Sequence, residues 1–340
     1  MKKIIFIMGC LGLLLVAACN KEVSENFNLY TSHPLNDTIW AKNDNIIYSV
    51  HNLFNNLTPD MIEDTFDVGS GKSLRFGDSL EISFEAGSCV DGRSPGSRAQ
   101  GIAELQLLPL KRKGDFIRLF RSTVAGNGSL LETGGGYFIR ILKDDKELSL
   151  AGNATFKLRF NDVDTAAKLN MQLFYGKEDF PVPVESIDRA FFWIRDFDTT
   201  PLKTWEKNSN NPLIPSYSGY EMISKNIRWV MAGRYADSTQ PKTKVTAILS
   251  PNFTNKNTAV FAVFTNQKTV VNLGADYASR SFFANNIPLN SAIKLVSLSK
   301  IAGNFYLGET TISSVAKVTS YKIIPAKTSL KDILSYLNKL

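Results

Sequence analysis

The sequence predicts an all-β protein built from two β-sandwiches and a short C-terminal helix. Three observations support this prediction: short runs in which apolar and polar residues alternate, turns rich in Gly, Asn and Asp between these runs, and helical periodicity at the C-terminal end. Alternation at period two places the apolar side chains on one face of a strand. Regular short strands separated by turn signals are typical of sandwiches.

The chain begins with a secretion signal. Lys2 and Lys3 precede the apolar run Ile4–Val16, which is too short to cross a bilayer, and Cys19 follows two alanines. This pattern resembles a bacterial lipobox, so Cys19 is the predicted lipidation site and 1–18 the signal peptide; an ordinary secretory signal is the alternative. The expected location is the cell envelope, as an outer-membrane lipoprotein held by its lipid. The residues CNKE partly resemble the surface-export signal of Bacteroidota lipoproteins, which leaves periplasmic and surface exposure both open.

Cysteine usage, charge and the glycine pattern argue against internal disulfides, nucleic-acid binding and a phosphate-binding loop. Cys10 would leave with the signal peptide and Cys19 would be acylated, so Cys89 remains as a single thiol and no internal disulfide is expected. The formal net charge is +7, but acidic residues are interspersed along the chain, and no basic face with interleaved aromatic residues indicates nucleic-acid binding. The GKS at 71–73 lacks the first glycine of a phosphate-binding loop and precedes a strand pattern, so we expect a turn there.

The first series of strands runs from about residue 74 to 175. In the run TFKLRF (155–160), the apolar side chains point to one side of a strand and the basic ones to the other, as in a sheet with one solvated face. Asp144 and Asp145 lie between two further runs and predict a tight hairpin turn.

The second series follows a proline-rich stretch within which AFFWIRDF predicts one strand. The run Ala259–Phe264 is apolar at every position, which predicts an interior strand. The segment TSLKDILSYLNKL (328–340) repeats its apolar residues at helical spacing behind an N-cap at Thr328 or Ser329, which predicts a short helix docked on the second sandwich. The expected organisation is therefore a signal peptide (1–18), a tether (19–35), an N-terminal segment packing on the first sandwich (36–73), the first sandwich (74–180), a connection (181–216), the second sandwich (217–325) and the C-terminal helix (326–340).

The strand sequence resembles a known family. LEISFEAGSCVDG, KRKGDFIR and LLETGGGYFIRILKDDKELSLA are similar to the ZU5-like β-sandwich of uncharacterised Bacteroidota envelope lipoproteins, and NIRWVMAGRYADSTQPKTKVTAILSPNFT is similar to their second domain. The resemblance covers most of 74–315 and rests on turns and strand entries. It implies an Ig-like, ZU5-like sandwich and a role in protein interaction. The string SRSFFAN contains no histidine, so the self-cleavage known for some ZU5 arrays is not expected.

Few residues are suited to catalysis. His33 and His51 are the two histidines of the chain and both precede the first sandwich, so we expect no Ser-His-Asp triad, no multi-histidine metal site and no cofactor. Cys89 lies in a polar loop without an evident activating base. The sequence therefore predicts a protein that is not an enzyme.

Two acidic groups are the alternatives to this prediction. Asp196 and Asp198 lie two residues apart on a predicted strand and form the pair that a glycoside hydrolase would need, although solvated edge charges would show the same pattern. Asn161, Asp162 and Asp164 offer oxygen ligands for calcium, but the spacing of a calcium-binding loop is missing, which favours a polar turn.

Aromatic residues give the stronger indication of binding. The tentative ligand-binding residues are Trp193, Phe197, Trp205, Trp229 and Tyr235, whose rings would stack on a sugar or anchor a protein partner; burial in the core is the alternative. The leading prediction is a lipid-anchored, non-enzymatic envelope protein that displays its sandwiches for protein or polysaccharide binding. A carbohydrate-active hydrolase and a structural component of an envelope complex are the alternatives.

Overall fold

The structure is a computed structural model and confirms the all-β fold with a short C-terminal helix. Residues Thr38–Leu340 make one compact unit, separate from Met1–Asp37. The predictions for 1–18 and 19–35, including lipidation of Cys19, lie outside the described residues. The structure describes residues 37–42, 48–91, 97–162, 166–178, 191–197, 202–207, 217–236 and 239–340.

The first sandwich packs a five-stranded sheet, the first outer sheet, against an eight-stranded one, the first inner sheet. Apolar side chains from both sheets fill the space between them. The first outer sheet has the order β11 (Lys203–Lys207), β12 (Tyr217–Ser224), β8 (Phe156–Asn161), β3 (Leu80–Phe84) and β2 (Lys72–Phe76). The first inner sheet has the order β1 (Ile62–Asp67), β5 (Ile102–Leu110), β6 (Leu131–Lys143), β13 (Arg228–Tyr235), β9 (Gln172–Lys177) and β10 (Phe192–Arg195), with β7 (Lys146–Leu150) beside β6 and β4 (Cys89–Asp91) beside β7.

The second sandwich packs a four-stranded sheet, the second outer sheet, against a five-stranded one, the second inner sheet. A separate apolar core lies between them. The second outer sheet has the order β17 (Gly274–Asp276), β18 (Ser281–Pro288), β14 (Lys242–Ile248) and β21 (Thr319–Lys322). The second inner sheet has the order β16 (Val270–Asn272), β15 (Thr258–Phe264), β19 (Ile293–Ile301), β20 (Asn304–Ile312) and β22 (Ala326–Thr328).

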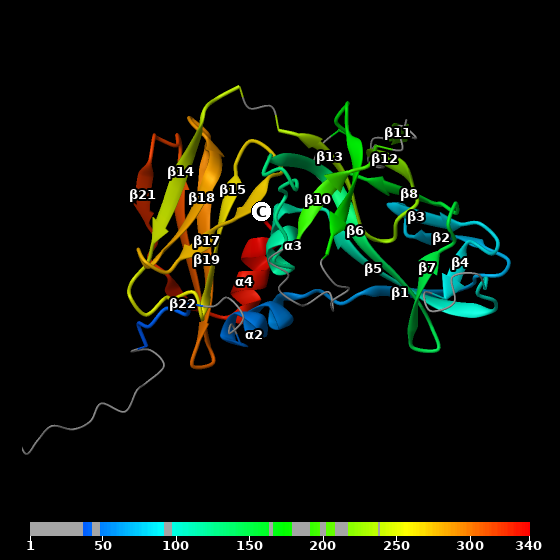
Figure 1. Ribbon diagram of the computed structural model, residues 1–340, viewed down its shortest axis with the longest axis horizontal. Coiled ribbons are helices and arrows are strands. Elements are labelled where there is room, and N and C mark those ends of the chain that lie inside the picture. Colours follow the sequence, from blue (N-terminus) through cyan, green and yellow to red (C-terminus); the bar gives the residue numbers. More distant parts are fainter. Residues whose placement is uncertain are drawn as a thin grey trace, which may run out of the picture. The chain divides into compact units, whose positions relative to one another are not determined.

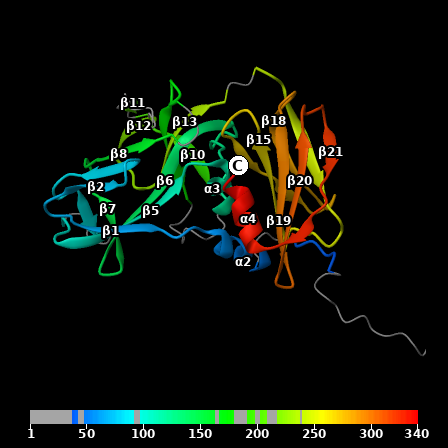
Figure 2. The same ribbon diagram turned by 180° about the vertical axis from the view of Figure 1, so that it is seen from behind.

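Within the described ranges, three helices lie between the two inner sheets: α2 (Tyr48–Leu57), α3 (Lys113–Arg118) and α4 (Leu330–Leu337). Figure 1 and Figure 2 show them there from opposite sides. Their apolar side chains form a third core with one face of each inner sheet. Both inner sheets are therefore buried on two faces. This explains why β15 is buried at all of its positions, as its continuous apolar run predicted.

Hydrogen bonds join the two sandwiches in addition to apolar packing. The backbone N–H of Thr123 donates to the carbonyl of Val270 at 2.8 Å, and the hydroxyl of Thr123 accepts from the Val270 N–H at 2.9 Å. The N–H of Thr133 donates to the carbonyl of Lys268 at 3.0 Å. The edge of the second inner sheet is thus paired with backbone of the first sandwich, and the junction is an ordered part of the fold.

The domain boundary expected at residue 217 is wrong. Strand β12 pairs with β8, and β13 pairs with both β6 and β9, so both strands belong to the first sandwich. The strands of the second sandwich begin with β14 at Lys242. The connection expected at 181–216 contributes β10 and β11 to the first sandwich as well.

Two further expectations about packing need correction. The N-terminal segment 36–73 does not pack on the first sandwich alone, because Trp40 lies in the core of the second, with its ring centroid 5.0 Å from that of Phe282. The C-terminal helix begins after the predicted N-cap Ser329, whose hydroxyl accepts from the Asp332 N–H at 3.1 Å. This helix lies in the layer between the inner sheets and is not docked on the second sandwich alone.

The predicted turns are confirmed. Asp144 and Asp145, between β6 and β7, have φ angles of 49° and 58°, the left-handed pair that a two-residue hairpin requires. Gly71 has φ 70° in the turn between β1 and β2, so the GKS segment enters a strand and not a helix. The arrangement of a phosphate-binding loop is therefore missing at this position.

Candidate functional site

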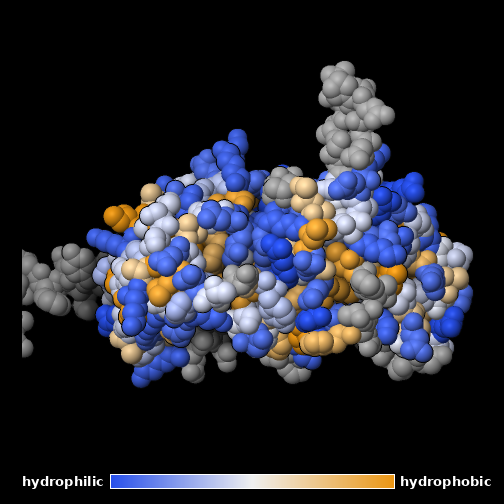
Figure 3. Space-filling model, turned by 90° about the horizontal axis from the view of Figure 1, so that it is seen from above, coloured by the Kyte–Doolittle hydropathy of each residue, from blue (hydrophilic) through white to orange (hydrophobic). Residues whose placement is uncertain are grey.

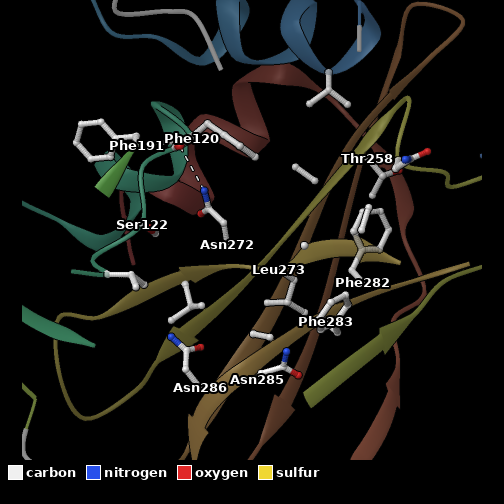
Figure 4. A pocket seen from close by; sticks show the side chains of 18 of the residues that line it. Phe120, Ser122, Phe191, Thr258, Asn272, Leu273, Phe282, Phe283, Asn285 and Asn286 are labelled. Carbon is white, nitrogen blue, oxygen red and sulfur yellow. Dashed lines mark hydrogen bonds between the residues drawn. The ribbon is translucent and has the colours of Figure 1, made fainter. Parts of the chain in front are cut away.

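A cleft of about 440 Å³ opens where the two sandwiches meet. One side is made by the segment that follows α3 and by the start of β10, which contribute Phe120 and Phe191. The other side is made by β16, β17 and β18, which contribute Asn272 and Phe283 (Figure 4). Ligand pockets form preferentially at such domain junctions, so this cleft is the candidate site.

The segment after α3 is held in an unusual backbone conformation. The Phe120 N–H donates to Ile117 O at 3.0 Å, and the Arg121 N–H donates to Phe116 O at 2.8 Å, which together form a Schellman motif. Phe120 occupies the left-handed position of this motif with φ 52°, where glycine is the usual residue. Its ring packs edge-on against Phe54 at 5.0 Å, and this packing offsets the backbone strain. The cleft wall is thus rigid at Phe120.

A buried arginine supports the same wall from behind. Arg121 has no exposed surface, and its guanidinium lies 4.8 Å from the ring centroids of both Phe191 and Trp229. A cation between two aromatic rings is strongly attracted to both when water is excluded. Arg121 therefore fixes the position of Phe191, which lines the cleft.

Neutral amides provide the polar part of the cleft. The side-chain NH₂ of Asn272 donates to Phe120 O at 3.3 Å, drawn as the dashed line in Figure 4, and that of Asn286 donates to Gly128 O at 3.0 Å. The Oδ1 atom of Asn272 is buried and has no hydrogen-bond partner among the described residues. These bonds fix the orientation of both amides and leave oxygen acceptors for a ligand or water.

The cleft is uncharged. None of the described residues that line it carries a charged side chain, and the lining combines phenyl rings with amides and hydroxyls. The lining side chains offer no counter-charge to an ionic ligand, and the Lys244 ammonium, 4.5 Å from the centroid of the Phe283 ring, lies outside the lining. The chemistry therefore suits a neutral ligand that has both apolar surface and hydroxyl or amide groups.

Two of the predicted binding aromatics are core residues. Trp193 and Trp229 are 0% and 1% exposed, so neither ring is open to a ligand. The indole N–H of Trp193 donates to Ser122 O at 2.8 Å, and that of Trp229 donates to Glu178 Oε1 at 2.8 Å. Both side chains are fully used by the fold, which corrects their tentative assignment to ligand binding.

The other three predicted aromatics lie apart from each other. Phe197 is 74% exposed just after β10, with the guanidinium of Arg195 5.4 Å from its ring. Tyr235 is 40% exposed and lies on a smaller groove of about 300 Å³. Trp205 is partly buried in a third groove, on the first outer sheet. The structure therefore does not bring the five predicted residues into one site.

The predicted acidic groups do not form a described catalytic or metal site. Asp196 follows β10, and its backbone N–H donates to Leu173 O at 2.8 Å; Asp198 lies outside the described residues. Of the calcium candidates, Asp164 lies outside them too, whereas Asp162 is buried and bonded to protein groups. In the described ranges, no group of three His, Cys, Asp or Glu side chains is placed to hold a metal ion.

The remaining sequence candidates offer no reactive group that the structure describes. Cys89 is fully buried in the first core, and this burial raises the pKa of its thiol, which disfavours the nucleophilic thiolate. His33 lies outside the described residues. His51 lies in α2, and the position of its side chain is not among those described.

A buried ion pair crosses the junction between the sandwiches. The ammonium of Lys268, in the second sandwich, lies 2.6 Å from the Asp162 carboxylate of the first, and the two side chains are 11% and 1% exposed. The Lys111 ammonium donates to Asn161 Oδ1 at 2.8 Å, and burial lowers its pKa to about 8. Because the Lys268–Asp162 pair joins one sandwich to the other, we interpret this pair as a structural link between them.

Sequence reasoning missed the residues that form the cleft. Asn272, Phe283 and Asn286 show no motif, because they come from separate strands that meet only after the sandwiches pack. One signal was present in the sequence: the run FFANN (282–286) combines two rings with two amides on one strand, β18.

The comparisons with known proteins gave no match, either among protein-family models or among curated proteins. The resemblance to ZU5-like lipoproteins therefore stays a prediction. Across the part of the chain that the structure describes, no helix is long and apolar enough to span a bilayer. The face seen in Figure 3 is mostly hydrophilic, with apolar residues in small separate patches.

Proposed function

We propose that this chain is a lipid-anchored, non-enzymatic protein of the cell envelope, related to ZU5-like lipoproteins, whose paired sandwiches bind a neutral polysaccharide in the junction cleft. The N-terminal pattern ending at Cys19 supports the anchor. The uncharged cleft carries the binding proposal, because phenyl rings beside fixed amides match the C–H faces and hydroxyl groups of sugar rings.

A rigid frame is the second support. Phe120 and Phe191 are held by the Schellman motif and by Arg121, and Asn272 and Asn286 are held by backbone carbonyls. A site whose groups are fixed before binding loses little conformational entropy when the ligand arrives. The cleft therefore has the properties of a preformed site, and a neutral protein segment is the alternative occupant.

The test compares two matched phenylalanines. Phe283 lines the cleft and Phe305 does not, yet both are partly buried on strands and each has a lysine ammonium near its ring, at 4.5 Å and 5.2 Å. A glycan array would first identify neutral oligosaccharides that bind the full chain. Calorimetry should then show that Phe283→Ala weakens binding about tenfold or more, while Phe305→Ala leaves it unchanged.

Three outcomes would contradict the proposal. The cleft is not the site if the two alanine variants lose affinity equally. If no neutral glycan binds and Phe283→Ala weakens the binding of a protein partner instead, the cleft takes a protein segment and not a sugar. Release of sugar from a bound glycan would favour the hydrolase alternative. Asp196→Asn would then test whether this aspartate takes part, because loss of turnover in that variant identifies a catalytic carboxylate.

A further inference from the structure

A second groove, of about 290 Å³, lies on the solvent-facing side of the first outer sheet, away from the junction cleft. Its lining includes Arg75 on β2, Glu81 on β3, Arg159 on β8, and Trp205 and Lys207 on β11. These residues come from both end strands of the sheet order, from the middle strand β8 and from β3 beside it. Unlike the cleft, this groove is strongly polar and charged.

Arg159 is fixed in orientation but its donors are unused. Its guanidinium carbon lies 4.3 Å from the centroid of the Trp205 ring. The ring is itself held, because its indole N–H donates to Tyr220 O at 3.2 Å. Among the residues that the structure describes, no acceptor receives a hydrogen bond from the Arg159 guanidinium. A stacked guanidinium whose N–H groups remain available is preorganised to receive a planar acceptor.

The carboxylates on the neighbouring strands already have other partners. Glu81 lies opposite Arg159 in the strand pairing, but its carboxylate accepts from the Ser73 hydroxyl at 2.8 Å and lies 3.4 Å from Arg75. On the other side, Glu221 pairs with the ammonium of Lys157 at 3.0 Å. Among the described residues, Arg159 therefore makes no ion pair within 4 Å with either carboxylate, although its charge helps to lower the pKa of Glu81.

We propose that this groove binds the carboxylate of an acidic sugar, a uronic acid residue, through Arg159. The planar guanidinium matches a carboxylate with two parallel hydrogen bonds. Arg75 and Lys207 add positive charge, so the groove carries three cationic side chains against the two acidic ones, Asp78 and Glu81. Trp205 supplies an aromatic surface beside the carboxylate position for the C–H groups of a sugar ring.

The position on a sheet face favours a sugar over an acidic peptide. Extended peptides usually bind at a sheet edge, where unpaired N–H and C=O groups accept them. Strand β8 lies in the middle of its sheet, between β12 and β3, so its backbone groups already pair with these strands. Arg159 therefore offers its side chain only, which suits a rigid ring that bears a carboxylate.

The test uses one oligosaccharide in two forms. Calorimetry on the full chain would compare a galacturonic acid oligosaccharide with its methyl ester, which keeps the rings and removes the charge. The acid form should bind at least about tenfold more tightly. Arg159→Lys keeps the charge but loses the paired hydrogen bonds, so it should weaken the acid form about tenfold. The matched control Arg280→Lys, at an exposed arginine in the turn before β18, should have no effect.

Further variants distinguish this site from the cleft. Lys207→Gln removes an exposed charge of the groove, and we expect binding of the acid form to fall about threefold with the thermal unfolding temperature unchanged. The cleft variant Phe283→Ala should leave binding of the acid form intact, so failure of one site can be told from failure of the other.

Three results would overturn this inference. Equal binding of the acid and its ester would show that the carboxylate is not recognised. If Arg159→Lys bound the acid as tightly as the wild type, general positive charge would explain the attraction. If polyglutamate competed as well as the oligosaccharide did, the partner would be an acidic peptide and the assignment to a sugar would be wrong.

Discussion

The buried ion pair across the junction permits a quantitative test of how the sandwiches are held together. In Lys268→Met, the carboxylate of Asp162 would keep a hydrogen bond from the Tyr220 hydroxyl, at 3.3 Å, but would lose the ammonium at 2.6 Å. Removing one partner of a buried pair costs about 3–5 kcal/mol, because the other charge stays buried. Since Tyr220 still compensates part of this charge, we expect Lys268→Met to lower the free energy of unfolding by about 3 kcal/mol.

Urea denaturation of the wild type, Lys268→Met, Asp162→Asn and the double variant would measure this loss. Asp162→Asn removes the charge that Lys268→Met leaves behind, so the double variant should lose at least about 1 kcal/mol less than the sum of the single losses. The control is Lys294→Met, since Lys294 pairs with Glu309 at 3.2 Å but the two side chains are 27% and 45% exposed; it should lose less than about 1 kcal/mol.

Two results would refute this reasoning. Equal losses in Lys268→Met and Lys294→Met would show that burial does not strengthen the first pair. Additive losses in the double variant would show that Lys268 and Asp162 act separately.

If the pair links the sandwiches, its loss should also separate their unfolding into two steps. The unfolding transitions followed by fluorescence and by circular dichroism would then no longer coincide.

Three further substitutions test other features of the fold. Burial lowers the pKa of Lys111 to about 8, so between about pH 8 and its usual value near 10.5 the unfolded chain binds a proton that the folded chain does not. Lys111→Met should therefore raise the free energy of unfolding by about 1–2 kcal/mol at pH 7, and this gain should shrink as the pH rises through that window; a constant gain in urea titrations would contradict it. Gly135 has φ 118°, so Gly135→Ala should cost about 1–3 kcal/mol in the same assay, and a neutral result would show that the backbone relaxes at little cost. The buried hydroxyl of Tyr137 has no partner among the described residues, so Tyr137→Phe should leave stability unchanged or raise it by up to about 1 kcal/mol, whereas a clear loss of thermal stability would reveal a partner.

The strands could be predicted because their pattern is local. The run TFKLRF became β8, in which Phe156, Leu158 and Phe160 are buried and the intervening Lys157 is exposed. Successive side chains of a strand point to opposite faces of the sheet, so the alternation of apolar and polar residues is visible within six residues. The turn at Asp144 was equally local, since it depends only on residues that tolerate a left-handed backbone.

The two helices α2 and α3 were missed for different reasons. In α2, the buried residues Val50, Leu53, Phe54 and Leu57 follow helical spacing, so a signal was present. Helix α3 is only six residues long and has almost no periodicity. Helices this short depend on tertiary packing and on caps, which a sequence pattern barely shows.

The KGD segment shows how α3 is stabilised. The carboxylate of Asp115 accepts from the backbone N–H groups of Lys111 and Arg112 at 2.9 Å and 2.8 Å, which caps the start of the helix. A side chain at Gly114 would clash with the backbone carbonyl of Leu337, so glycine is needed where α4 approaches. The sequence contains this segment, but the need for its glycine lies in a helix more than 200 positions further along the chain.

The order of strands could not be read from the sequence because pairing is not local. Strands β12 and β13 mix apolar and polar residues much as β14 and β18 do, and nothing in either strand indicates which sheet it joins. Their partners are set by the apolar faces that remain open after the earlier strands have paired, and by the bulge between Ala232 and Gly233 that lets β13 follow β6. Counting strands in sequence order therefore placed the boundary before β12, two strands too early.

The residues of the candidate sites also depend on packing that is not local in the sequence. This explains why Trp193 and Trp229 are core residues and not the ligand-binding residues predicted for them. Trp193 and Trp229 have the largest rings near the junction, and they are buried because large rings contribute most to a core that must join two sheets and three helices. The rings that line the cleft, such as Phe120 and Phe283, are smaller and lie on segments whose backbone is fixed by other residues. A sequence shows how much aromatic surface a protein has, whereas the face on which each ring lies depends on the packing partner. Of the rings that line the cleft, Phe191 packs on both buried tryptophans, with ring centroids 5.1 Å and 5.4 Å apart. The residues to test for binding are therefore those that line the cleft, such as Phe283, and not the tryptophans themselves.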